Sequence, residues 1–478
     1  MRRLLSLVGA ACALAVAGPA LAAPFSAAEI ARVDALAVKA LADGGAPSVS
    51  IAVVRDGEIA FAKAYGRRSL ESDLPATTDS RYMIGSVAKQ FTATAVLLLA
   101  AEGRLHLEDP VGRYLPETTA ADRITLRQAL SHTAGYRGYF TLDTTPLEGR
   151  SPVSPGVVAD RWAKAPLDFE PGARWDYSNT GYTIAGLAVE QVAGQRLADL
   201  LQARVFAPLG MTSAGDIDRH PLTAADATGY SRFALGPPRP ARAIGPGWLF
   251  AVGDLAMTAS DLARWDVGVI DRRLMSAAGY EAFETEVKLA DGSGSGYGLG
   301  VYVDATRGVR RLHHDGSMDG FGSENRIYPD ARAAVVVLVN ADFAPIQFAL
   351  ADQLEAMLFP PPTATVEAAA MPRPAPAPAG AEELALARAL YGQVRAGRID
   401  RDRLMVDVDD YFSETALADY RDSLGPLGDP PGFVQVRRDT IGGLRASLYE
   451  LTWPDRKLIL ILRLRDDGKV ASFVVFPA

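Results

Sequence analysis

A serine and a lysine stand three residues apart at the start of an apolar segment, in Gly85-Ser86-Val87-Ala88-Lys89. The sequence from 87 to 101 is rich in Ala, Leu, Val and Thr and has no Pro or Gly, which predicts a buried helix that begins near Gly85. Residues i and i+3 share a helix face, so Ser86 and Lys89 are expected to point at the same place. A poorly hydrated lysine can be neutral near pH 7 and activate a serine. The pair therefore suggests a nucleophile with its proton partner.

A Ser-x-x-Lys pattern alone is weak, because a chain of 478 residues contains one by chance. The alternative is an ordinary residue at a helix start followed by a solvated lysine. Partners elsewhere in the chain must decide between the two interpretations.

Tyr177 and Asn179 place a phenol and a carboxamide two residues apart, next to a predicted helix from 178 to 192. Alternate residues of an extended backbone face one side, so both can enter a pocket that excludes Ser178. The phenol could act as a base near an ammonium group, and the amide could fix the lysine and a substrate carbonyl. The alternative is that Tyr177 is a core residue and Asn179 caps the helix.

The third segment is His313-His314-Asp315-Gly316-Ser317, at the end of a predicted strand. Gly316 would allow a close backbone approach, and the Ser317 N–H could pair with the Ser86 N–H as an oxyanion hole. The alternative is that the two histidines are strand residues, one of which faces solvent.

Together these segments resemble the penicillin-recognising serine hydrolases of the class C β-lactamase type, a group that includes D,D-carboxypeptidases, D-amino-acid peptidases and family VIII esterases. The resemblance covers residues 46–359 and includes segments 131–135, 208–211 and 248–265. It implies an acyl-enzyme on Ser86, with Lys89 and Tyr177 sharing the proton and either one acting as the base. It also implies an oxyanion hole from the Ser86 and Ser317 N–H groups, and substrate binding by Asn179, His314, Asp315 and Gly316.

Two residues depart from that family pattern. His314 stands where the family has a cation, and an unperturbed histidine is mostly neutral at pH 7. Asp315 stands where a hydroxyl residue often helps to bind a substrate carboxylate, which an aspartate would repel. We therefore expect neutral esters or amides, or amine-bearing substrates, to be preferred over penicillins and peptides with a free carboxylate.

Two other functions are compatible with the motifs. The first is a class C-type β-lactamase or D,D-carboxypeptidase with the same residues and a different pocket. The second is a non-catalytic protein that binds cell-wall fragments, which the intact Ser86, Lys89, Tyr177 and Asn179 argue against.

The elements around these segments predict an α/β (α+β) fold, with an antiparallel sheet flanked by helices and an inserted helical subdomain at about 105–300, as in β-lactamases and transpeptidases. A capping box of Ser26 and Glu29 opens a helix at 26–42, and Asp56-Gly57 joins a hairpin of 49–55 and 58–65 by a type I′ turn. Further strands are predicted at 296–303, 309–314, 323–328 and 333–339, and a closing helix at 345–359.

The chain is predicted to have four parts. Residues 1–22 have the basic start, apolar middle and Ala-x-Ala end of a signal peptide cleaved near Ala22, so we expect a periplasmic or secreted protein. Residues 23–359 form the hydrolase domain, and 360–380 a Pro/Ala-rich linker. Residues 381–478 form a small α+β accessory domain, with a helix at 381–396 and strands at 433–438, 444–453, 457–464 and 470–476.

The composition limits the partners. A net charge of −8 argues against nucleic acid or anionic lipid as the main partner, and no integral membrane association is expected after cleavage. The one cysteine, Cys12, lies in the expected signal peptide, and the five histidines include no His-Glu-x-x-His. We therefore expect no cofactor and no metal, and a small ester, amide or peptide as substrate. The oligomeric state and the role of the accessory domain have no sequence signature.

Overall fold

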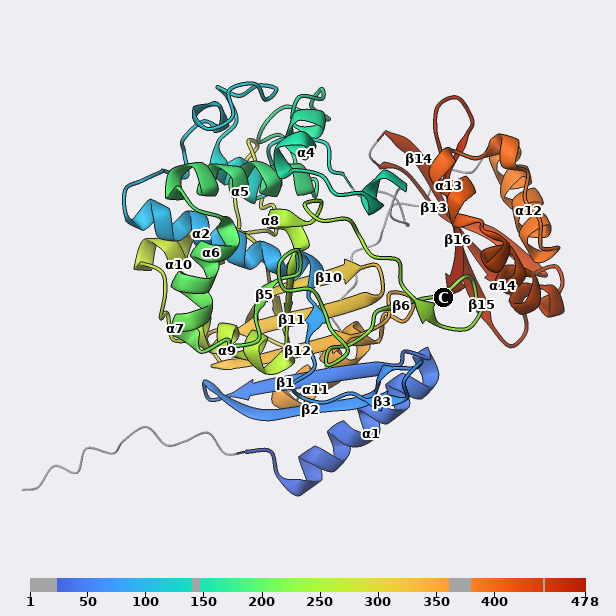
Figure 1. Cartoon of the computed structure of the whole chain (residues 1–478), viewed down its shortest axis with the longest axis horizontal. Helices are drawn as coiled ribbons and strands as arrows, with labels where there is room; N and C mark the ends of the chain where they lie inside the picture. Colours follow the sequence, from blue (N-terminus) through green and yellow to red (C-terminus); the bar gives the residue numbers. More distant parts are fainter. Residues whose placement is uncertain (1–23, 140–146, 361–379, 442) are drawn as a thin grey trace, which may run out of the picture.

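The computed structural model describes residues 24–139, 147–360, 380–441 and 443–478 (Figure 1). The expected signal peptide, Cys12 and most of the expected linker lie outside the described residues. Among the residues that are described, no helix is long and apolar enough to cross a membrane.

A seven-stranded antiparallel sheet forms the centre of the main unit, in the order β3-β2-β1-β12-β11-β10-β9. The first strand, β1, therefore pairs with the last strand of the unit, β12, although the inserted helices lie between them in the sequence. The predicted antiparallel sheet with flanking helices is confirmed. The strands are β1 Ser48–Arg55, β2 Glu58–Ser69, β3 Leu74–Pro75, β9 Tyr302–Thr306, β10 Val309–Met318, β11 Phe321–Tyr328 and β12 Ala333–Val339.

Both faces of this sheet are covered. Alternate residues of β12 enter different cores: Val335 and Val337 pack with α1 (Ala27–Gly44) and α11 (Ile346–Leu358), whereas Val336 and Leu338 pack with the inserted helices. Figure 1 shows α1 on the opposite side of the sheet from α2 and α5. Because successive strand residues point to opposite faces, β12 must be apolar at every position, as its sequence is.

The helical insertion carries the residues that face the end of β10. Its larger helices are α2 Lys89–Ala101, α4 Pro155–Trp162, α5 Asn179–Ala193, α9 Ala259–Ile270 and α10 Ala277–Glu284. Shorter helices are the 3-10 turn η1 Gly85–Ala88, η2 Val111–Arg113, α3 Leu126–Leu130, η3 Leu147–Arg150, α6 Leu197–Leu201, the π turn η4 Gln202–Phe206, α7 Ala207–Leu209 and α8 Phe250–Gly253. Short strands are β4 Tyr82–Met83, β5 Gly215–Asp216, β6 Tyr230–Ser231, β7 Arg239–Pro240 and β8 Leu255–Met257.

Several predicted local features are present. The Ser26–Glu29 capping box opens α1, and Asp56 and Gly57 both have positive φ, as a type I′ turn requires. The strand predicted at 296–303 is wrong, because β9 begins only at Tyr302. Gly300 explains the difference: its φ is +90°, and a Cβ there would lie 2.9 Å from the Lys89 carbonyl oxygen, so the chain is irregular where it passes α2.

The C-terminal residues form a second unit with its own apolar core. A four-stranded antiparallel sheet, in the order β13-β14-β15-β16, packs against three helices, of which α13 and α14 were not predicted. The separate core supports our proposed division of the chain near 360–380. The elements are α12 Ala381–Arg395, η5 Arg401–Arg403, α13 Val406–Tyr411, α14 Glu414–Leu424, η6 Gly425–Leu427, β13 Gly432–Ile441, β14 Leu444–Thr452, β15 Lys457–Leu464 and β16 Val470–Pro477.

The two units contact each other through both charged and apolar side chains. Arg239 of β7 donates two hydrogen bonds to Asp419 of α14, at 2.6 and 2.8 Å. Phe233 packs edge-on against Tyr411, with 5.2 Å between ring centroids, and so extends the C-terminal core into the main unit. In Figure 1 the β6 region of the main unit lies beside the C-terminal sheet.

Candidate active site

Ser86 and Lys89 share one face of the turn that leads into α2. Ser86 lies in η1, and Lys89 is the first residue of α2, so one 3-10 turn separates them. The Lys89 Nζ atom lies 3.1 Å from Ser86 Oγ and donates to the Val252 carbonyl oxygen at 3.0 Å. The structure thus brings together the pair that the sequence singled out, and adds a carbonyl from α8 that orients the amine.

The environment of Lys89 favours a neutral amine. The side chain is fully buried, and burial lowers its pKa well below the ordinary value, although the negative charge of Asp315 partly opposes this shift. The amine can donate one N–H to Val252 and direct its lone pair toward Ser86 Oγ. A base that can accept the serine proton is therefore in place.

Tyr177 lies against the same amine. Lys89 Nζ is 4.9 Å from the centroid of its ring, a distance at which an ammonium ion is stabilised by an aromatic face. Burial raises the pKa of Tyr177 well above its ordinary value, and the nearby Ser86 hydroxyl offsets this only in part. Within the described part of the chain the buried Tyr177 hydroxyl has no hydrogen-bond partner at ordinary geometry. Tyr177 is thus a protonated phenol, suited to give a proton rather than to take the first one.

Asn179 begins α5 at the edge of the site. Its Nδ2 atom donates to the Tyr139 carbonyl oxygen at 2.9 Å, and its buried Oδ1 atom has no partner among the described residues. A hydrogen bond from Asn179 to Lys89 was expected, but the described residues do not show one. The Lys89 amine donates to the Val252 carbonyl oxygen instead. Asn179 is therefore fixed through its nitrogen, while its oxygen is left without a partner among the described residues.

The end of β10 lies directly against η1. A Cβ at Gly316 would come within 2.1 Å of the Ile84 carbonyl oxygen, so only glycine permits this approach. A Cβ on Gly85 would lie 3.1 Å from the Ser317 backbone nitrogen. The Ser317 backbone nitrogen thus lies beside the residue that precedes Ser86, and an oxyanion hole from the Ser86 and Ser317 N–H groups stays a prediction.

His314 is buried beside these groups and is held at both ring nitrogens. Its Nδ1–H donates to the Asp315 carbonyl oxygen at 2.6 Å, so in the neutral ring Nε2 accepts from the Tyr297 hydroxyl at 3.0 Å. Burial lowers the pKa of His314 to about 4, with Asp315 acting in the opposite direction. At neutral pH the imidazole is therefore uncharged and supplies no cation to the site.

Asp315 contributes the negative charge of this region. The side chain is half-buried, and its charge acts on Lys89, Tyr177 and His314, whose pKa values it raises in each case. With Lys89 and His314 both neutral, Asp315 leaves the candidate site with a net negative charge.

Two side chains with clear roles in this geometry were not predicted as site residues. His132 accepts a hydrogen bond from the Ser178 N–H at 3.0 Å, and its ring lies 4.3 Å from the ring of Tyr177. Tyr297 holds His314, as described above. The Ser131-His132-Thr133-Ala134-Gly135 segment resembles the family and so pointed to His132. Nothing in the sequence near Tyr297 indicates a role for that residue.

The described residues include no group of three or more His, Cys, Asp or Glu side chains arranged to hold a metal ion.

Comparison with known proteins yields a consistent set of similarities. A family model described as Beta-lactamase matches residues 33–356. The putative penicillin-binding protein PbpX of Bacillus subtilis (strain 168) is 29% identical over 293 residues, which are 60% of this chain and 69% of that protein. The D-aminopeptidase of Brucella anthropi is 30% identical over 302 residues, 62% of this chain and 56% of that relative, so the match spans little more than half of its length. Among solved structures, a D-stereospecific amidohydrolase from Streptomyces sp. has a TM-score of 0.59 at 26% identity, covering 68% of this chain and 97% of that one.

Proposed function

The chain belongs to the Beta-lactamase family of serine hydrolases, and from that premise we propose that it hydrolyses amides and esters through an acyl-enzyme on Ser86, with amine-bearing amides as its preferred substrates. The observation that carries the proposal is the buried Lys89 amine, 3.1 Å from Ser86 Oγ and with a lowered pKa.

In the proposed acylation step, the Lys89 lone pair takes the Ser86 proton as Oγ bonds to the substrate carbonyl carbon. The Ser86 and Ser317 N–H groups hold the oxyanion that develops. When the tetrahedral intermediate collapses, Tyr177 gives its proton to the leaving nitrogen or oxygen and recovers one from the Lys89 ammonium. The serine proton thus leaves with the product, and both residues return to their starting states.

Deacylation follows the same route with water as the nucleophile. Lys89 takes a proton from the water that attacks the ester, and that proton returns to Ser86 Oγ when the acid departs. His314 stays neutral throughout, since its pKa is about 4. No step therefore requires the cation that the family usually has at this position.

The preferred substrate class follows from the charge of the site. The charge of Asp315 acts on Lys89 and His314, which are both neutral, so a substrate carboxylate near these residues would be repelled and an ammonium group attracted. The names of the D-aminopeptidase and the D-stereospecific amidohydrolase agree with a preference for amides that carry an amine. We propose amides of amino acids with a free amine, of the D-series in particular, with short esters as accepted substrates.

A comparison of three substrates tests this proposal: D-phenylalanine p-nitroanilide, p-nitrophenyl acetate and nitrocefin. We expect kcat/KM to be highest for the D-amino-acid amide and lowest for nitrocefin, with no turnover of any of them by Ser86→Ala. Efficient nitrocefin hydrolysis would instead support a class C-type β-lactamase. Release of D-alanine from a peptide with a free carboxylate would support a D,D-carboxypeptidase.

The binding-protein alternative has a different outcome. A non-catalytic protein for cell-wall fragments would not react with a fluorophosphonate probe, whereas the proposed hydrolase adds one label to the peptide that contains Ser86. Mass spectrometry of the labelled chain separates the two.

We also propose export, with cleavage near Ala22, on the basis of the basic, apolar and small-residue order of the first residues. N-terminal sequencing of the protein purified from a periplasmic extract tests it, and a chain that retains Met1 to Ala22 there would contradict cleavage.

A further inference from the structure

A cavity of about 490 Å³ lies next to the candidate active site, and α8 forms part of the wall between them. The Val252 carbonyl of α8 accepts from Lys89, while Phe250 and Asp254 at its two ends line the cavity. On α2, Ala88 and Thr92 line the cavity, although Lys89 between them faces Ser86. The cavity is thus a separate space that shares two elements with the site described above.

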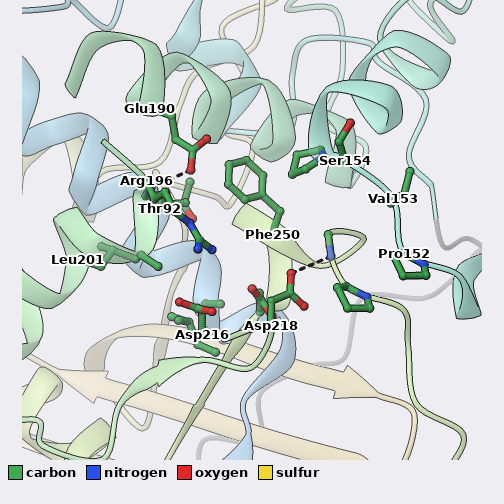
Figure 2. Close-up of a pocket in the computed structure, with 18 residues that line it drawn as sticks. Thr92, Pro152, Val153, Ser154, Glu190, Arg196, Leu201, Asp216, Asp218 and Phe250 are labelled. Carbon is green, nitrogen blue, oxygen red and sulfur yellow. Dashed lines mark hydrogen bonds between the residues drawn. The ribbon is translucent and has the colours of Figure 1, made fainter. Parts of the chain in front are cut away.

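The polar groups of this cavity are mostly acidic. Asp216 and Asp218 enter from β5 and the residues after it, Glu190 from the end of α5, and Arg196 from the start of α6 (Figure 2). Figure 2 shows Arg196, Asp216 and Asp218 directed into the same space, with the Phe250 ring above them. With Asp254, four carboxyl groups and one guanidinium group line the cavity.

Three of these acids have structural partners, and Glu190 accepts a hydrogen bond from the Leu197 N–H at 2.9 Å. Asp216 accepts a hydrogen bond from the Arg219 N–H at 2.8 Å, and Asp218 accepts one from the Gly247 N–H at 2.7 Å. Both bonds use a single carboxylate oxygen, so each side chain keeps a second oxygen for another donor.

Asp254 is different, because one oxygen of its buried carboxyl group has no partner, although the Ile217 N–H interacts with the group. The residue is only 5% exposed, it lines the cavity, and its Oδ1 atom has no hydrogen-bond partner among the described residues. A buried carboxyl oxygen without a partner costs free energy. Burial, together with the charges of Asp218 and Asp216, raises its pKa to about 9.

We propose that this cavity binds a small organic ammonium ion, whose charged nitrogen pairs with Asp254 and is attracted by the charges of Asp216 and Asp218, and whose apolar body packs on Phe250 and Leu201. The described carboxylates do not form a cluster that could hold a metal ion. An organic cation fits the combination of separated acids and apolar walls better, because its N–H groups and its hydrocarbon part can satisfy both.

Binding of such a cation is coupled to the proton on Asp254. The titratable and charged groups that face Asp254 are Asp216, Asp218, Glu190 and Arg196, and the acids among them favour its protonated form. A bound ammonium reverses that balance, so the carboxyl must lose its proton when the ligand enters. Affinity is therefore expected to increase as the pH rises from 6 toward 9.

Isothermal titration calorimetry of the full-length protein with benzylamine tests the proposal, with benzyl alcohol as the neutral molecule of the same shape. We expect benzylamine binding that Asp315→Asn in the candidate active site leaves unchanged, and at least tenfold weaker binding of benzyl alcohol, because a charge-assisted hydrogen bond is replaced by a neutral one. Equal affinities for the two compounds, or an affinity for benzylamine that does not change with pH, would overturn it.

Asp254→Asn keeps the shape of the side chain and removes its charge, so benzylamine should bind at least tenfold more weakly while benzyl alcohol is unaffected. Asp199→Asn is the matched control, because Asp199 is exposed on α6, pairs with Arg219 and does not line the cavity. If Asp254→Asn does not fold, the exposed Asp218→Asn serves instead, with an expected loss of about twofold to fivefold. Unchanged benzylamine binding in the folded variant would locate the cation elsewhere and refute the assignment.

Discussion

The imidazole ring of His132 packs against the phenol ring of Tyr177, with 4.3 Å between their centroids, while its Nδ1 atom accepts the Ser178 N–H. One buried side chain therefore fixes both the ring of a proposed catalytic residue and the backbone that carries it. Its φ of 60°, in a region that few residues other than glycine adopt, indicates that the surrounding structure constrains it.

We predict that His132→Ala lowers kcat about tenfold to a hundredfold with little change in KM, because Tyr177 shifts from its position near the leaving group. His132→Asn should recover part of the loss, since its carboxamide oxygen can accept the Ser178 N–H. His106→Ala is the control, as that histidine is exposed. If kcat falls no more in His132→Ala than in the control, His132 has no positioning role.

The neutral state of Lys89 predicts the shape of the pH profile. A base must be unprotonated, so kcat/KM should rise with pH and level off above the Lys89 pKa, which burial sets well below that of a free lysine. Lys89→Arg should lose about 10²- to 10⁴-fold at every pH, because a guanidinium group keeps its proton. A profile that rises only above pH 10 would mean that Lys89 is charged in the resting enzyme and that another group is the base.

The charge of Asp315 predicts a change of substrate preference in Asp315→Asn. Removal of the negative charge should lower kcat/KM for D-phenylalanine p-nitroanilide and raise it for a substrate with a free carboxylate, each by about tenfold, the effect of roughly 1.4 kcal/mol between charges in a partly buried site. Activity on neutral p-nitrophenyl acetate should stay within about twofold, which separates selectivity from damage to the site. Asp330→Asn, at a salt bridge with Arg310 far along β10, is the control. Parallel losses on all three substrates would contradict the charge argument.

The predictions that rested on local sequence patterns were the most accurate. The capping box of α1, the turn between β1 and β2 and the span of β12 follow from residue types that act on their immediate neighbours. The failure at 296–303 has a tertiary cause, because the backbone at Gly300 is shaped by its contact with Lys89. The helices α13 and α14 were missed because their segments are rich in Asp and Glu, and only their packing against the second core reveals the apolar side.

In the candidate site too, residue types could be identified from the sequence, whereas contacts made only by folding could not. Ser86, Lys89, Tyr177 and His314 could be chosen from residue types in three segments, and the structure brings those segments together. The Val252 carbonyl that orients Lys89 is a backbone group, which no residue type reveals. His132 acts on Ser178 from 46 residues away, so its effect exists only in the folded chain.

One of the ion pairs between the two units joins Arg239 to Asp419, whose carboxylate is nearly buried. The Asp419 side chain is 9% exposed and receives both hydrogen bonds of the guanidinium, whereas that of Arg239 is 40% exposed. Loss of the arginine would leave a carboxylate in a poorly hydrated place without its partner.

We predict that Arg239→Ala lowers the free energy of unfolding by about 1–3 kcal/mol, measured by urea denaturation, because the cost comes from the unpaired Asp419 and is reduced by the partial exposure of the pair. Arg421→Ala is the matched control: its partner Asp422 is adjacent and exposed, so no measurable change in stability is expected. The double variant Arg239→Ala, Asp419→Ala should be more stable than Arg239→Ala alone, since it removes the unpaired charge along with its partner. Equal stabilities of Arg239→Ala and Arg421→Ala would show that this pair does not stabilise the contact between the units, which would then rest on Phe233 against Tyr411 and on the ion pairs of Asp410 with Arg150 and Arg242.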